Sequence, residues 1–430
     1  MNIATHPKHG SYKDSGFDWV GDVPSHWRVE RLGSTLTTVS EKNHPALPLL
    51  SITREQGVIE RDIEDQDSNH NFIPDDLSGY KLLRDGQFGM NKMKAWQGSY
   101  GVSAYTGIVS PAYFVFDFTR EVDPQFFNIA IRSRLYVSYF GSASDGVRIG
   151  QWDLNQSRMK QIPILLPPLP EQCAIAAFLD GKCATIDEVV RIKEEQVRLL
   201  AERRQILIQQ AVTRGLNLDA PMKDSGIDWI GQIPVHWEVV PLKRLFRERN
   251  DRSTTGAETL LSLRMNEGLV PHNDVSDKAI GADALKDYKQ VFPGQLVMNR
   301  MRASIGIFGI VTSSGIVSPD YAIFDIAARA NGDFFLQLFK TGVMGQQFRN
   351  SSRGLGTGSS GFMRLYTDDF GAISVALPPA AEQAEIVLHI NSLSEKIGDA
   401  VRLKQDQIAA LKEYKTSLIN AAVTGKIKVA

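Results

Sequence analysis

The chain has 430 residues, with 48 Lys and Arg against 49 Asp and Glu, and a formal net charge of −1. The length exceeds the ~250–300 residues over which one hydrophobic core grows, and the 43% apolar and 23% charged shares exclude a disordered or fibrous chain. Cys173 and Cys183 form no CxxC pair, which excludes a disulfide scaffold and a zinc ribbon. No apolar run reaches the ~18–20 residues of a membrane span, and the start lacks a signal peptide's apolar core, so we expect a cytoplasmic chain without a membrane segment.

The sequence contains one unit twice. Four blocks recur in the same order: KDSGxDWxGxxPxHW, MN followed by alternating Met and basic residues, GIVSP, and LPPxxEQ. They begin at Lys13, Met90, Gly107 and Leu166, and again at Lys223, Met298, Gly315 and Leu377. The nearly constant distance between copies indicates a tandem duplication of about 210 residues, which is far too long for a solenoid repeat.

Each copy begins with about 150 residues of mixed texture. Short β-branched and aromatic runs such as AYFVFDF and YAIFDI, separated by Gly, Pro, Asn and Asp, predict strands and turns. A helix is expected around Phe126–Tyr139. The blocks Met90–Lys94 and Met298–Arg302 mix apolar with basic or polar residues, which predicts a half-buried strand with its Asn, Lys and Arg side chains gathered on one face.

Each copy ends in a long helical pattern. From Glu171 to Thr213 there is no Pro and no Gly after Gly181, and apolar residues recur at heptad spacing. The second copy keeps this stripe, and Gly215 and Gly425 follow the last turns. A helix of ~42 residues is about 60 Å long, which is more than its own domain can cover. We therefore expect the two helices to pair as a coiled coil, with antiparallel pairing favoured and parallel pairing not forbidden.

The sequence shows no catalytic constellation. It lacks a P-loop, the tetrapeptide with which amino-methyltransferases hold a target base, GxSxG and HExxH. Residues 356–361 match GxGxxG, but they follow a polar stretch and open no helical pattern, which favours a flexible loop over a dinucleotide site. His26 and His236 precede Trp at equivalent places in the two copies. That equivalence favours a structural role over metal ligation, so no metal site is expected.

Positive charge gathers in two segments. Arg132–Lys160 holds five basic residues against two acidic ones, and Lys340–Arg364 holds four basic residues and no acidic one. The second segment is rich in Gly, Ser and Arg, whose backbone can approach phosphates closely and whose side chains can donate hydrogen bonds to them. Basic faces and Gly/Ser loops are often merely solvated. Their coincidence in both copies favours nucleic-acid binding at the level of the module.

Taken together, the duplicated motifs resemble the DNA-specificity subunits of type I restriction–modification systems, over essentially the whole chain. The resemblance implies an α+β fold, with two tandem mixed α/β target-recognition domains separated by two long helices that form an antiparallel coiled coil, in an internal pseudo-two-fold repeat. The expected segments are target-recognition domain 1 (residues 1–165), a central helical region (166–216), target-recognition domain 2 (217–376) and a C-terminal helical region (377–430).

The resemblance also implies a subunit without catalysis of its own. Each domain would read one half of a bipartite site in double-stranded DNA. The helices would set the spacing and, with the LPPxxEQ motifs, dock two methyltransferase subunits, and restriction (motor-nuclease) subunits would join them. S-adenosylmethionine, ATP and Mg are expected on those partners, and no cofactor on this chain. A subunit serving methylation only, and a coiled-coil scaffold without sequence-specific DNA binding, are the alternatives.

Candidate DNA-binding residues are polar or basic side chains in the repeated blocks and basic segments. They are Asn91, Lys92, Lys94, Arg148 and Gln151 in the first copy, and Asn299, Arg300, Arg302, Arg353, Thr357 and Arg364 in the second. The loops of the two copies differ in sequence, GSASDGVRIGQWD against RNSSRGLGTGSSGFMRLYTDD. We therefore expect the two half-sites to differ and the full site to be asymmetric.

Overall fold

The structure, a computed structural model, describes residues 6–62, 73–146, 152–277, 280–355 and 362–429. It divides into two compact units: unit 1 is Met1–Glu194 with Gln405–Ala430, and unit 2 is Glu195–Lys404. Each unit joins one mixed region with half of each long helix, so the units cut across the four segments expected from the sequence. Among the described residues, no helix combines the length and apolar composition that a membrane span requires.

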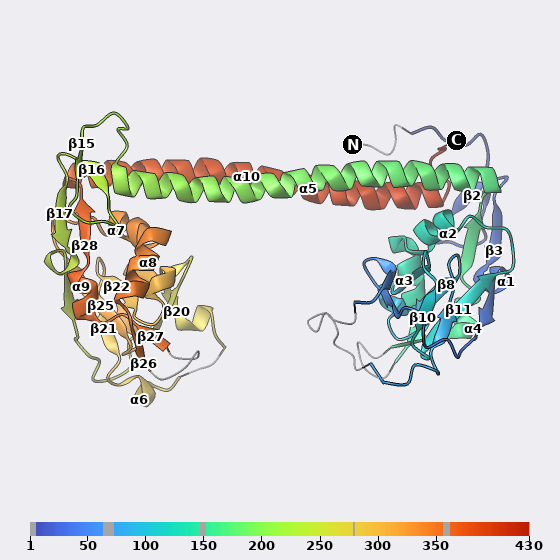
Figure 1. Cartoon of the computed structure of the whole chain (residues 1–430), viewed down its shortest axis with the longest axis horizontal. Helices are drawn as coiled ribbons and strands as arrows, with labels where there is room; N and C mark the ends of the chain where they lie inside the picture. Colours follow the sequence, from blue (N-terminus) through green and yellow to red (C-terminus); the bar gives the residue numbers. More distant parts are fainter. Residues whose placement is uncertain (1–5, 63–72, 147–151, 278–279, 356–361, 430) are drawn as a thin grey trace. The chain divides into compact units, whose positions relative to one another are not determined.

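The mixed region of unit 1 is built from short strands and helices (Figure 1). In chain order they are β1 (Tyr12–Asp14), β2 (Asp22–Pro24), β3 (Arg28–Arg31), α1 (Leu32–Thr35), β4 (Leu36–Val39), β5 (Leu50–Thr53), β6 (Gly57–Glu60), β7 (Lys81–Leu83), β8 (Phe88–Asn91), η2 (Ala95–Gln97), β9 (Tyr100–Val102), β10 (Gly107–Val109), β11 (Tyr113–Phe118), α2 (Pro124–Ile131), α3 (Arg134–Ser142), β12 (Ser144–Asp145), β13 (Asp153–Leu154), α4 (Gln156–Met159) and β14 (Pro163–Leu166). The long helix α5 (Leu169–Arg214) follows.

Unit 2 repeats this order with small changes. Its elements are β15 (Met222–Asp224), β16 (Gln232–Pro234), β17 (Glu238–Pro241), η3 (Leu242–Arg244), β18 (Phe246–Arg249), β19 (Leu261–Arg264), β20 (Gly268–Pro271), η4 (His272–Asp274), α6 (Ala282–Leu285), β21 (Lys289–Val291), β22 (Leu296–Asn299), η5 (Ala303–Ile305), β23 (Phe308–Ile310), β24 (Gly315–Val317), β25 (Tyr321–Ile326), α7 (Gly332–Phe339), α8 (Gly342–Ser351), β26 (Arg353–Leu355), β27 (Phe362–Arg364), α9 (Thr367–Ala372) and β28 (Ser374–Leu377). The long helix α10 (Ala380–Val423) follows.

A four-stranded antiparallel sheet forms the centre of each mixed region. Its strand order is β4-β11-β8-β9 in unit 1 and β18-β25-β22-β23 in unit 2. Phe88 and Phe116 are opposite one another in the first sheet, and both are fully buried. The strand that enters each region pairs with the strand that leaves it, β3 with β14 and β17 with β28. This pairing brings together the two ends of each mixed region, and a long helix begins directly after the second strand of the pair, α5 after β14 and α10 after β28.

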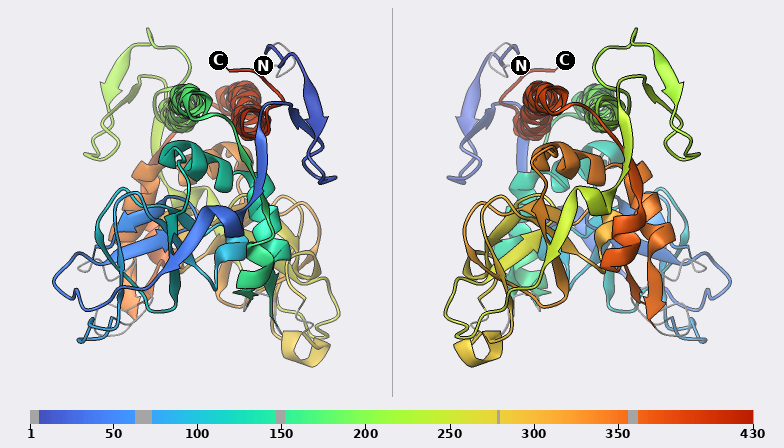
Figure 2. Two further views of the ribbon diagram at one scale, coloured as in Figure 1. Left: turned by 90° about the vertical axis from the view of Figure 1, so that its right-hand side faces the viewer. Right: turned by 90° about the vertical axis from the view of Figure 1, so that its left-hand side faces the viewer.

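The helix expected around Phe126–Tyr139 is in fact two helices, so that prediction is wrong in detail. The chain breaks between α2 and α3 because Ser133 is extended, with φ −61° and ψ 151°. Just before the break, the Arg132 guanidinium donates to the backbone oxygens of Tyr100, Arg54 and Glu55. One face of α2 packs against the long helices, with Phe126 in the same cluster as α5 residues (Figure 2).

The long helices form as the sequence predicts. A glycine in the left-handed region follows each helix, Gly215 at φ 78° directly after α5 and Gly425 at φ 69° two residues after α10, a conformation that glycine adopts without the penalty of a Cβ. The heptad stripe is buried near the mixed regions, for example at Ile175 and Leu179 in unit 1 and at Ile386 and Ile390 in unit 2.

The helices are antiparallel in each unit. In unit 1, Lys415 of α10 lies 2.7 Å from Asp187 of α5, and Gln407 of α10 lies 2.6 Å from Lys193 of α5. Residue numbers therefore increase along one helix as they decrease along the other. In unit 2 the Lys404 ammonium donates to Gln196 at 2.7 Å, and Arg204 donates to Ser394. The α+β fold with an antiparallel coiled coil is therefore confirmed, and parallel pairing is excluded.

Two of the repeated motifs contact one another, and we call this contact the helix clasp. In unit 1 the clasp consists of His26, Trp27, Glu171 and Gly425. The Glu171 carboxylate accepts from His26 Nε2 at 2.7 Å and from Trp27 Nε1 at 3.1 Å. The fully buried Trp27 ring also lies against Gly425, since a Cβ there would be 3.3 Å from the ring. One tryptophan thus touches the start of α5 and the end of α10.

The clasp of unit 2 consists of His236, Trp237, Glu382 and Gly215, in the same arrangement. The Glu382 carboxylate accepts from His236 at 2.7 Å and from Trp237 at 3.0 Å. Trp237 is fully buried, and a Cβ on Gly215 would lie 3.3 Å from its ring. The PxHW and LPPxxEQ motifs therefore fasten each mixed region to both long helices.

The glutamine of each LPPxxEQ motif is also used inside its unit. Gln383 is fully buried; its Oε1 accepts from the Asn331 N–H at 2.7 Å, and its Nε2 donates to the Pro378 oxygen at 2.8 Å. Gln172 makes the equivalent bonds to Asp123 and Pro167. These two glutamine side chains are therefore used inside their own units, and a role of the LPPxxEQ motifs in docking partners stays a prediction from the sequence.

Replacing Gln383 with alanine is expected to lower the stability of unit 2 by about 2–4 kcal/mol, because it leaves the buried Pro378 carbonyl and the part-buried Arg329 carbonyl and Asn331 N–H without their partner. Chemical denaturation followed by tryptophan fluorescence measures the change. Gln196→Ala, at an exposed position of α5, is the control and should stay within about 0.5 kcal/mol of the parent. Equal effects of both substitutions would contradict the role assigned to Gln383.

Candidate nucleic-acid interface

A tight turn follows β8, an inner strand of the four-stranded sheet of unit 1. The strand β8 ends at Asn91, whose Oδ1 accepts from the Met93 N–H at 3.2 Å, and the Lys94 N–H donates to the Asn91 carbonyl. The Asn91 amide nitrogen donates to the Tyr113 hydroxyl at 3.2 Å. Asn91 is buried, so it shapes the turn, while Met93 and Lys94 lie exposed at its tip.

Unit 2 has the same turn. The Asn299 Oδ1 accepts from the N–H groups of Met301 and Arg302 at 3.1 and 3.2 Å. Met301 and Arg302 are exposed at the tip, in the places of Met93 and Lys94. We call these two segments, residues 91–94 and 299–302, the basic turns.

The prediction that Met90–Lys94 and Met298–Arg302 continue as half-buried strands is wrong. An asparagine side chain that bonds the backbone two residues ahead competes with the hydrogen bonds of a sheet, and it favours a turn. The strands accordingly stop at Asn91 and Asn299. The polar side chains do not share one strand face: the asparagine is used for the turn, and the last basic residue is at the tip.

Each basic turn contacts the segment that differs between the two copies. In unit 1 the Leu154 N–H donates to the Lys92 carbonyl at 3.0 Å, and Lys92 Nζ pairs with Asp153 at 2.8 Å. In unit 2 the Leu365 N–H donates to the Arg300 carbonyl at 3.0 Å. The structure therefore brings together, in both units, the two kinds of segment that the sequence singled out separately.

Most of the described basic candidates already have acidic partners. Arg300 lies 2.5 Å from Glu248. Two other candidates in unit 2 also form ion pairs, Arg353 with Asp369 at 2.5 Å and Arg364 with Asp320 at 2.6 Å. The hydrogen bond from Arg353 to Asp369 raises the pKa of the guanidinium, so it stays charged. Such partly exposed pairs contribute little stability and can be exchanged for another anion.

Lys94 and Arg302 differ from these residues. Both are exposed, and neither has a side-chain ion pair or hydrogen bond within the described part of the chain. They occupy equivalent places in the two basic turns. Each copy thus presents one free cation at the same position, which is the arrangement that a phosphate contact requires.

Three candidates lie outside the described residues: Arg148, Gln151 and Thr357. The GxGxxG match at 356–361 lies outside them as well. Their roles stay predictions from the sequence.

The structure adds aromatic and apolar side chains that the sequence reasoning missed. Beside the turn of unit 1, the Trp96 and Trp152 rings lie 5.2 Å apart. In unit 2, Met363 and Tyr366 are exposed, and the Arg364 guanidinium lies 5.9 Å from the Tyr366 ring. No local pattern could have revealed these neighbours, because each set comes from segments distant in sequence or from a loop without periodicity.

A lysine missed by the sequence reasoning supports each sheet from inside. Lys81 Nζ donates to the Tyr113 oxygen at 2.6 Å, and Lys289 Nζ donates to the Tyr321 oxygen at 2.8 Å. Burial lowers the pKa of both ammonium groups. Each lysine bonds the first residue of the strand, β11 or β25, that pairs with the strand ending in the basic turn. We therefore assign both lysines a structural role and not a direct contact with DNA.

Curated relatives match the chain over all or part of its length. It is 20% identical, over 97% of its residues and 98% of theirs, to a putative type I restriction enzyme MjaX specificity subunit of Methanocaldococcus jannaschii. It is 22% identical to the type I restriction enzyme EcoKI specificity subunit of Escherichia coli, over 75% of this chain and 68% of that one. No family model matches the sequence.

Solved structures share the fold. One, from work on complex assembly and conformational transition of the type I R-M system, aligns with a TM-score of 0.68 at 15% identity, over 93% of this chain and 98% of the other. The HsdS subunit of Thermoanaerobacter tengcongensis aligns with a TM-score of 0.56 at 18% identity, over 97% of this chain and the whole of the other. Together with the sequence relatives, they confirm what the repeated motifs indicated: the chain is related to the specificity subunits of type I restriction–modification systems.

Proposed function

We propose that this chain is the DNA-reading subunit of a type I restriction–modification complex, and that each mixed region reads one half of a bipartite site. One observation carries the proposal. In both units a basic turn with a cation that is exposed and unpaired within the described part of the chain lies against a segment whose sequence differs between the copies. A shared cation next to a variable loop is the division of labour of DNA readers, in which phosphate contacts position the protein and variable side chains specify bases.

The basic turns supply the phosphate contacts in this proposal. Lys94 and Arg302 reach phosphates directly, and Arg353 exchanges its carboxylate partner for a phosphate. Exposed Met301, Met363 and Tyr366 next to these cations give the surface of unit 2 the mixed apolar and basic character that suits sugars and base edges.

The variable segments supply the base contacts. We assign base reading to residues 144–154 in unit 1 and to residues 353–366 in unit 2, which include the candidates Arg148, Gln151, Thr357 and Arg364. The two segments have different sequences and lengths, and β26 and β27 replace the shorter β12 and β13. Different segments read different bases, so the proposed site is asymmetric.

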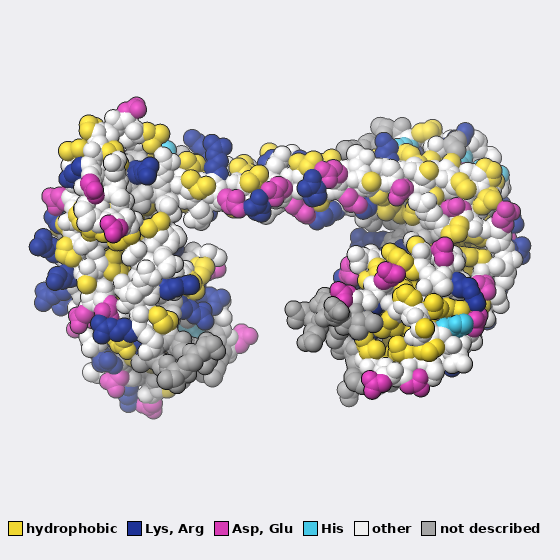
Figure 3. Space-filling model, viewed as in Figure 1, with side chains coloured by type: hydrophobic (Ala, Val, Ile, Leu, Met, Phe, Trp, Pro, Cys, Tyr) yellow, Lys and Arg dark blue, Asp and Glu magenta, His cyan; other side chains and the backbone are white. Residues whose placement is uncertain are grey.

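The long helices set the distance between half-sites and dock the partners. In this role α5 and α10 act as a ruler, and their exposed faces receive two methyltransferase subunits. Those faces carry both charges side by side (Figure 3). On α5, for example, Arg198 pairs with Glu195 at 2.6 Å and also with Glu202. Paired surface charges of this kind give specificity and orientation to a protein interface more than affinity.

The chain contributes recognition and no chemistry in this proposal. The partner subunits bind S-adenosylmethionine and methylate the site, and motor-nuclease subunits use ATP and Mg to cleave unmodified DNA. A system that only methylates would use the same chain without the nuclease.

Methylome sequencing tests the proposal. A host that carries this chain with its modification subunits is expected to show methylated bases at one bipartite, asymmetric motif. Exchange of residues 217–376 for those of a relative should change one half of the motif and leave the other half unchanged. If no motif is methylated while the complex assembles, the scaffold alternative holds; if the motif is methylated but unmodified DNA survives, the methylation-only alternative holds.

A further inference from the structure

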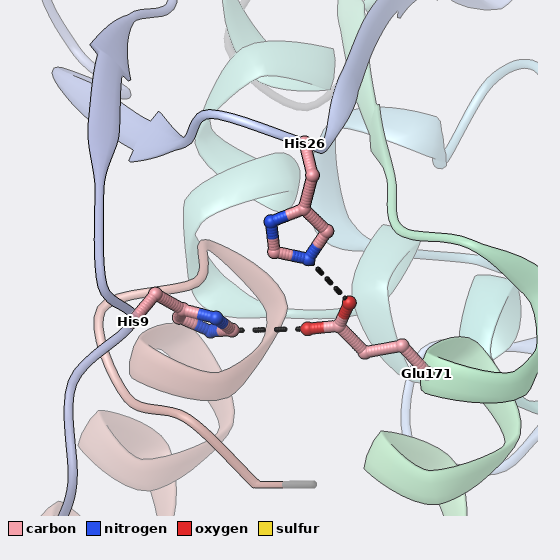
Figure 4. Close-up of side chains that lie close together, drawn as sticks. All are labelled: His9, His26 and Glu171. Atoms are coloured by element: carbon pink, nitrogen blue, oxygen red, sulfur yellow. Dashed lines mark hydrogen bonds and ion pairs between the residues drawn. The ribbon is translucent and has the colours of Figure 1, made fainter.

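Unit 1 contains a cluster of metal-ligating side chains that has no counterpart among the described residues of unit 2. His9, His26 and Glu171 each turn a donor atom toward the same point, and these three atoms lie within 4.8 Å of one another (Figure 4). His26 Nε2 is 2.7 Å from Glu171 Oε2, and His9 Nε2 is 3.8 Å from Glu171 Oε1. The residues come from three places in the fold: the segment before β1, the turn before β3, and the first turn of α5.

The His9 ring is the informative member. Its side chain is only 6% exposed, and its Nε2 has no hydrogen-bond partner among the described residues. A buried imidazole nitrogen without a hydrogen-bond partner is available as a metal ligand, and histidine is the commonest metal ligand among the side chains.

The geometry leaves room for an ion at this point. His9 Nε2 and Glu171 Oε1 face each other across 3.8 Å, which is too long for a hydrogen bond. An ion between the two atoms would be bound by both of them.

We propose that His9, His26 and Glu171 bind one divalent transition-metal ion, with Zn²⁺ the best match. Two imidazoles and a carboxylate form a three-ligand set that zinc uses with water in the fourth position. At Zn–N and Zn–O bonds of ~2.0–2.2 Å, tetrahedral ligands lie about 3.3 Å apart. The two observed separations, 2.7 and 3.8 Å, lie on either side of that value, so shifts of about half an ångström complete the site.

Unit 2 provides the matched comparison. His236 and Glu382 reproduce His26 and Glu171 at the same 2.7 Å. In the aligned repeat, Asp219 stands where the first copy has His9, and Asp219 is exposed. No third ligand faces Glu382 among the described residues. The same pair therefore serves only the helix clasp in unit 2 and gains a ligand site in unit 1.

The ion would fasten both ends of the described chain to α5. His9 lies in the segment that receives the Lys428 N–H on the Pro7 carbonyl at 2.7 Å, and Lys426 Nζ donates to the Asp22 carbonyl at 2.6 Å. An ion on Glu171 ties this segment, the tail after α10 and the first turn of α5 together. Its expected role is to stabilise unit 1, because it binds the folded arrangement and not the unfolded chain.

The test measures metal content and stability in the untagged full chain. After removal of metal with a chelator and dialysis against micromolar Zn²⁺, we expect about one zinc ion per chain by atomic emission. His9→Asn, His26→Asn and Glu171→Gln should each reduce the content to background. His236→Asn is the matched control in unit 2 and should retain the full content.

Two further readouts protect the result against misfolding. His26 is about half exposed, so His26→Asn is expected to fold, and circular dichroism checks each variant. Co²⁺ should give the visible absorption of a tetrahedral nitrogen–oxygen site in the parent and in His236→Asn only. A chelator should lower the melting temperature of the parent but leave His26→Asn unchanged. Zinc content at background in the parent, or equal content in the parent and in folded His26→Asn, would overturn the proposal.

Discussion

Replacement of Trp237 with alanine is expected to lower the free energy of unfolding of unit 2 by about 3–5 kcal/mol. The indole is fully buried, packs against the end of α5 at Gly215, and donates its N–H to Glu382 at the start of α10. Its removal leaves a large cavity and takes one of two hydrogen bonds from the Glu382 carboxylate, at a point where both long helices contact the mixed region. Denaturant unfolding, followed by far-ultraviolet circular dichroism, measures the loss.

Conservative and equivalent variants separate the contributions. Trp237→Phe retains most of the packing and loses the hydrogen bond, so a smaller loss of about 1–2 kcal/mol is expected. Trp27→Ala should reproduce the full effect in unit 1, because Trp27 is equally buried and donates to the equivalent carboxylate, that of Glu171. A loss below about 1 kcal/mol for either alanine variant would show that the clasp does not hold the helices.

The double substitution K94A/R302A is expected to weaken DNA binding without changing the preferred sequence. Each side chain is exposed and free within the described part of the chain, so its loss costs little stability. Loss of two phosphate contacts reduces the slope of log affinity against log salt by about 2, and at 0.1 M salt the affinity falls by about 50-fold. Fluorescence anisotropy over a range of KCl concentrations, with the assembled complex, measures both quantities.

The control for this experiment is Arg402→Ala. Arg402 is an exposed cation on α10 that pairs with Asp399 at 2.8 Å, so it tests whether any lost positive charge has the same effect. We expect its salt slope to equal that of the parent. If K94A/R302A leaves slope and affinity unchanged, the basic turns are not the phosphate contacts, and the proposed interface is wrong.

Local signals predicted the two long helices correctly and the ends of two strands incorrectly. The heptad stripe and the final glycines are written in consecutive residues, so the bounds of α5 and α10 follow from the sequence within a few positions. The blocks at Met90 and Met298 also carry a local pattern, but the asparagine in each competes with it through a backbone hydrogen bond. The alternation of apolar and polar residues does not show whether the asparagine side chain will bond the backbone and so end the strand.

Some long-range contacts join residues that a sequence pattern singles out, and others join residues that no pattern connects. The helix clasp had such a pattern, because the HW and EQ motifs recur together in both copies. The contact between the basic turn and the variable segment had none, since Leu154 and Lys92 share no pattern. His9 was missed for the opposite reason: reasoning by equivalence between copies assigned His26 a structural role, and a residue present in one copy only is invisible to that comparison.

The residue ranges of the two units also determine the order in which the units can fold during translation. Unit 2 is a continuous stretch, Glu195–Lys404, inserted into unit 1, whose two pieces lie on either side of it in the sequence. On the ribosome, unit 2 has all its residues while unit 1 still awaits Leu418 and Ala422, which pack in its core beside Leu179. The region translated first is thus the second to be completed, and we expect a premature stop within α10 to damage the amino-terminal mixed region.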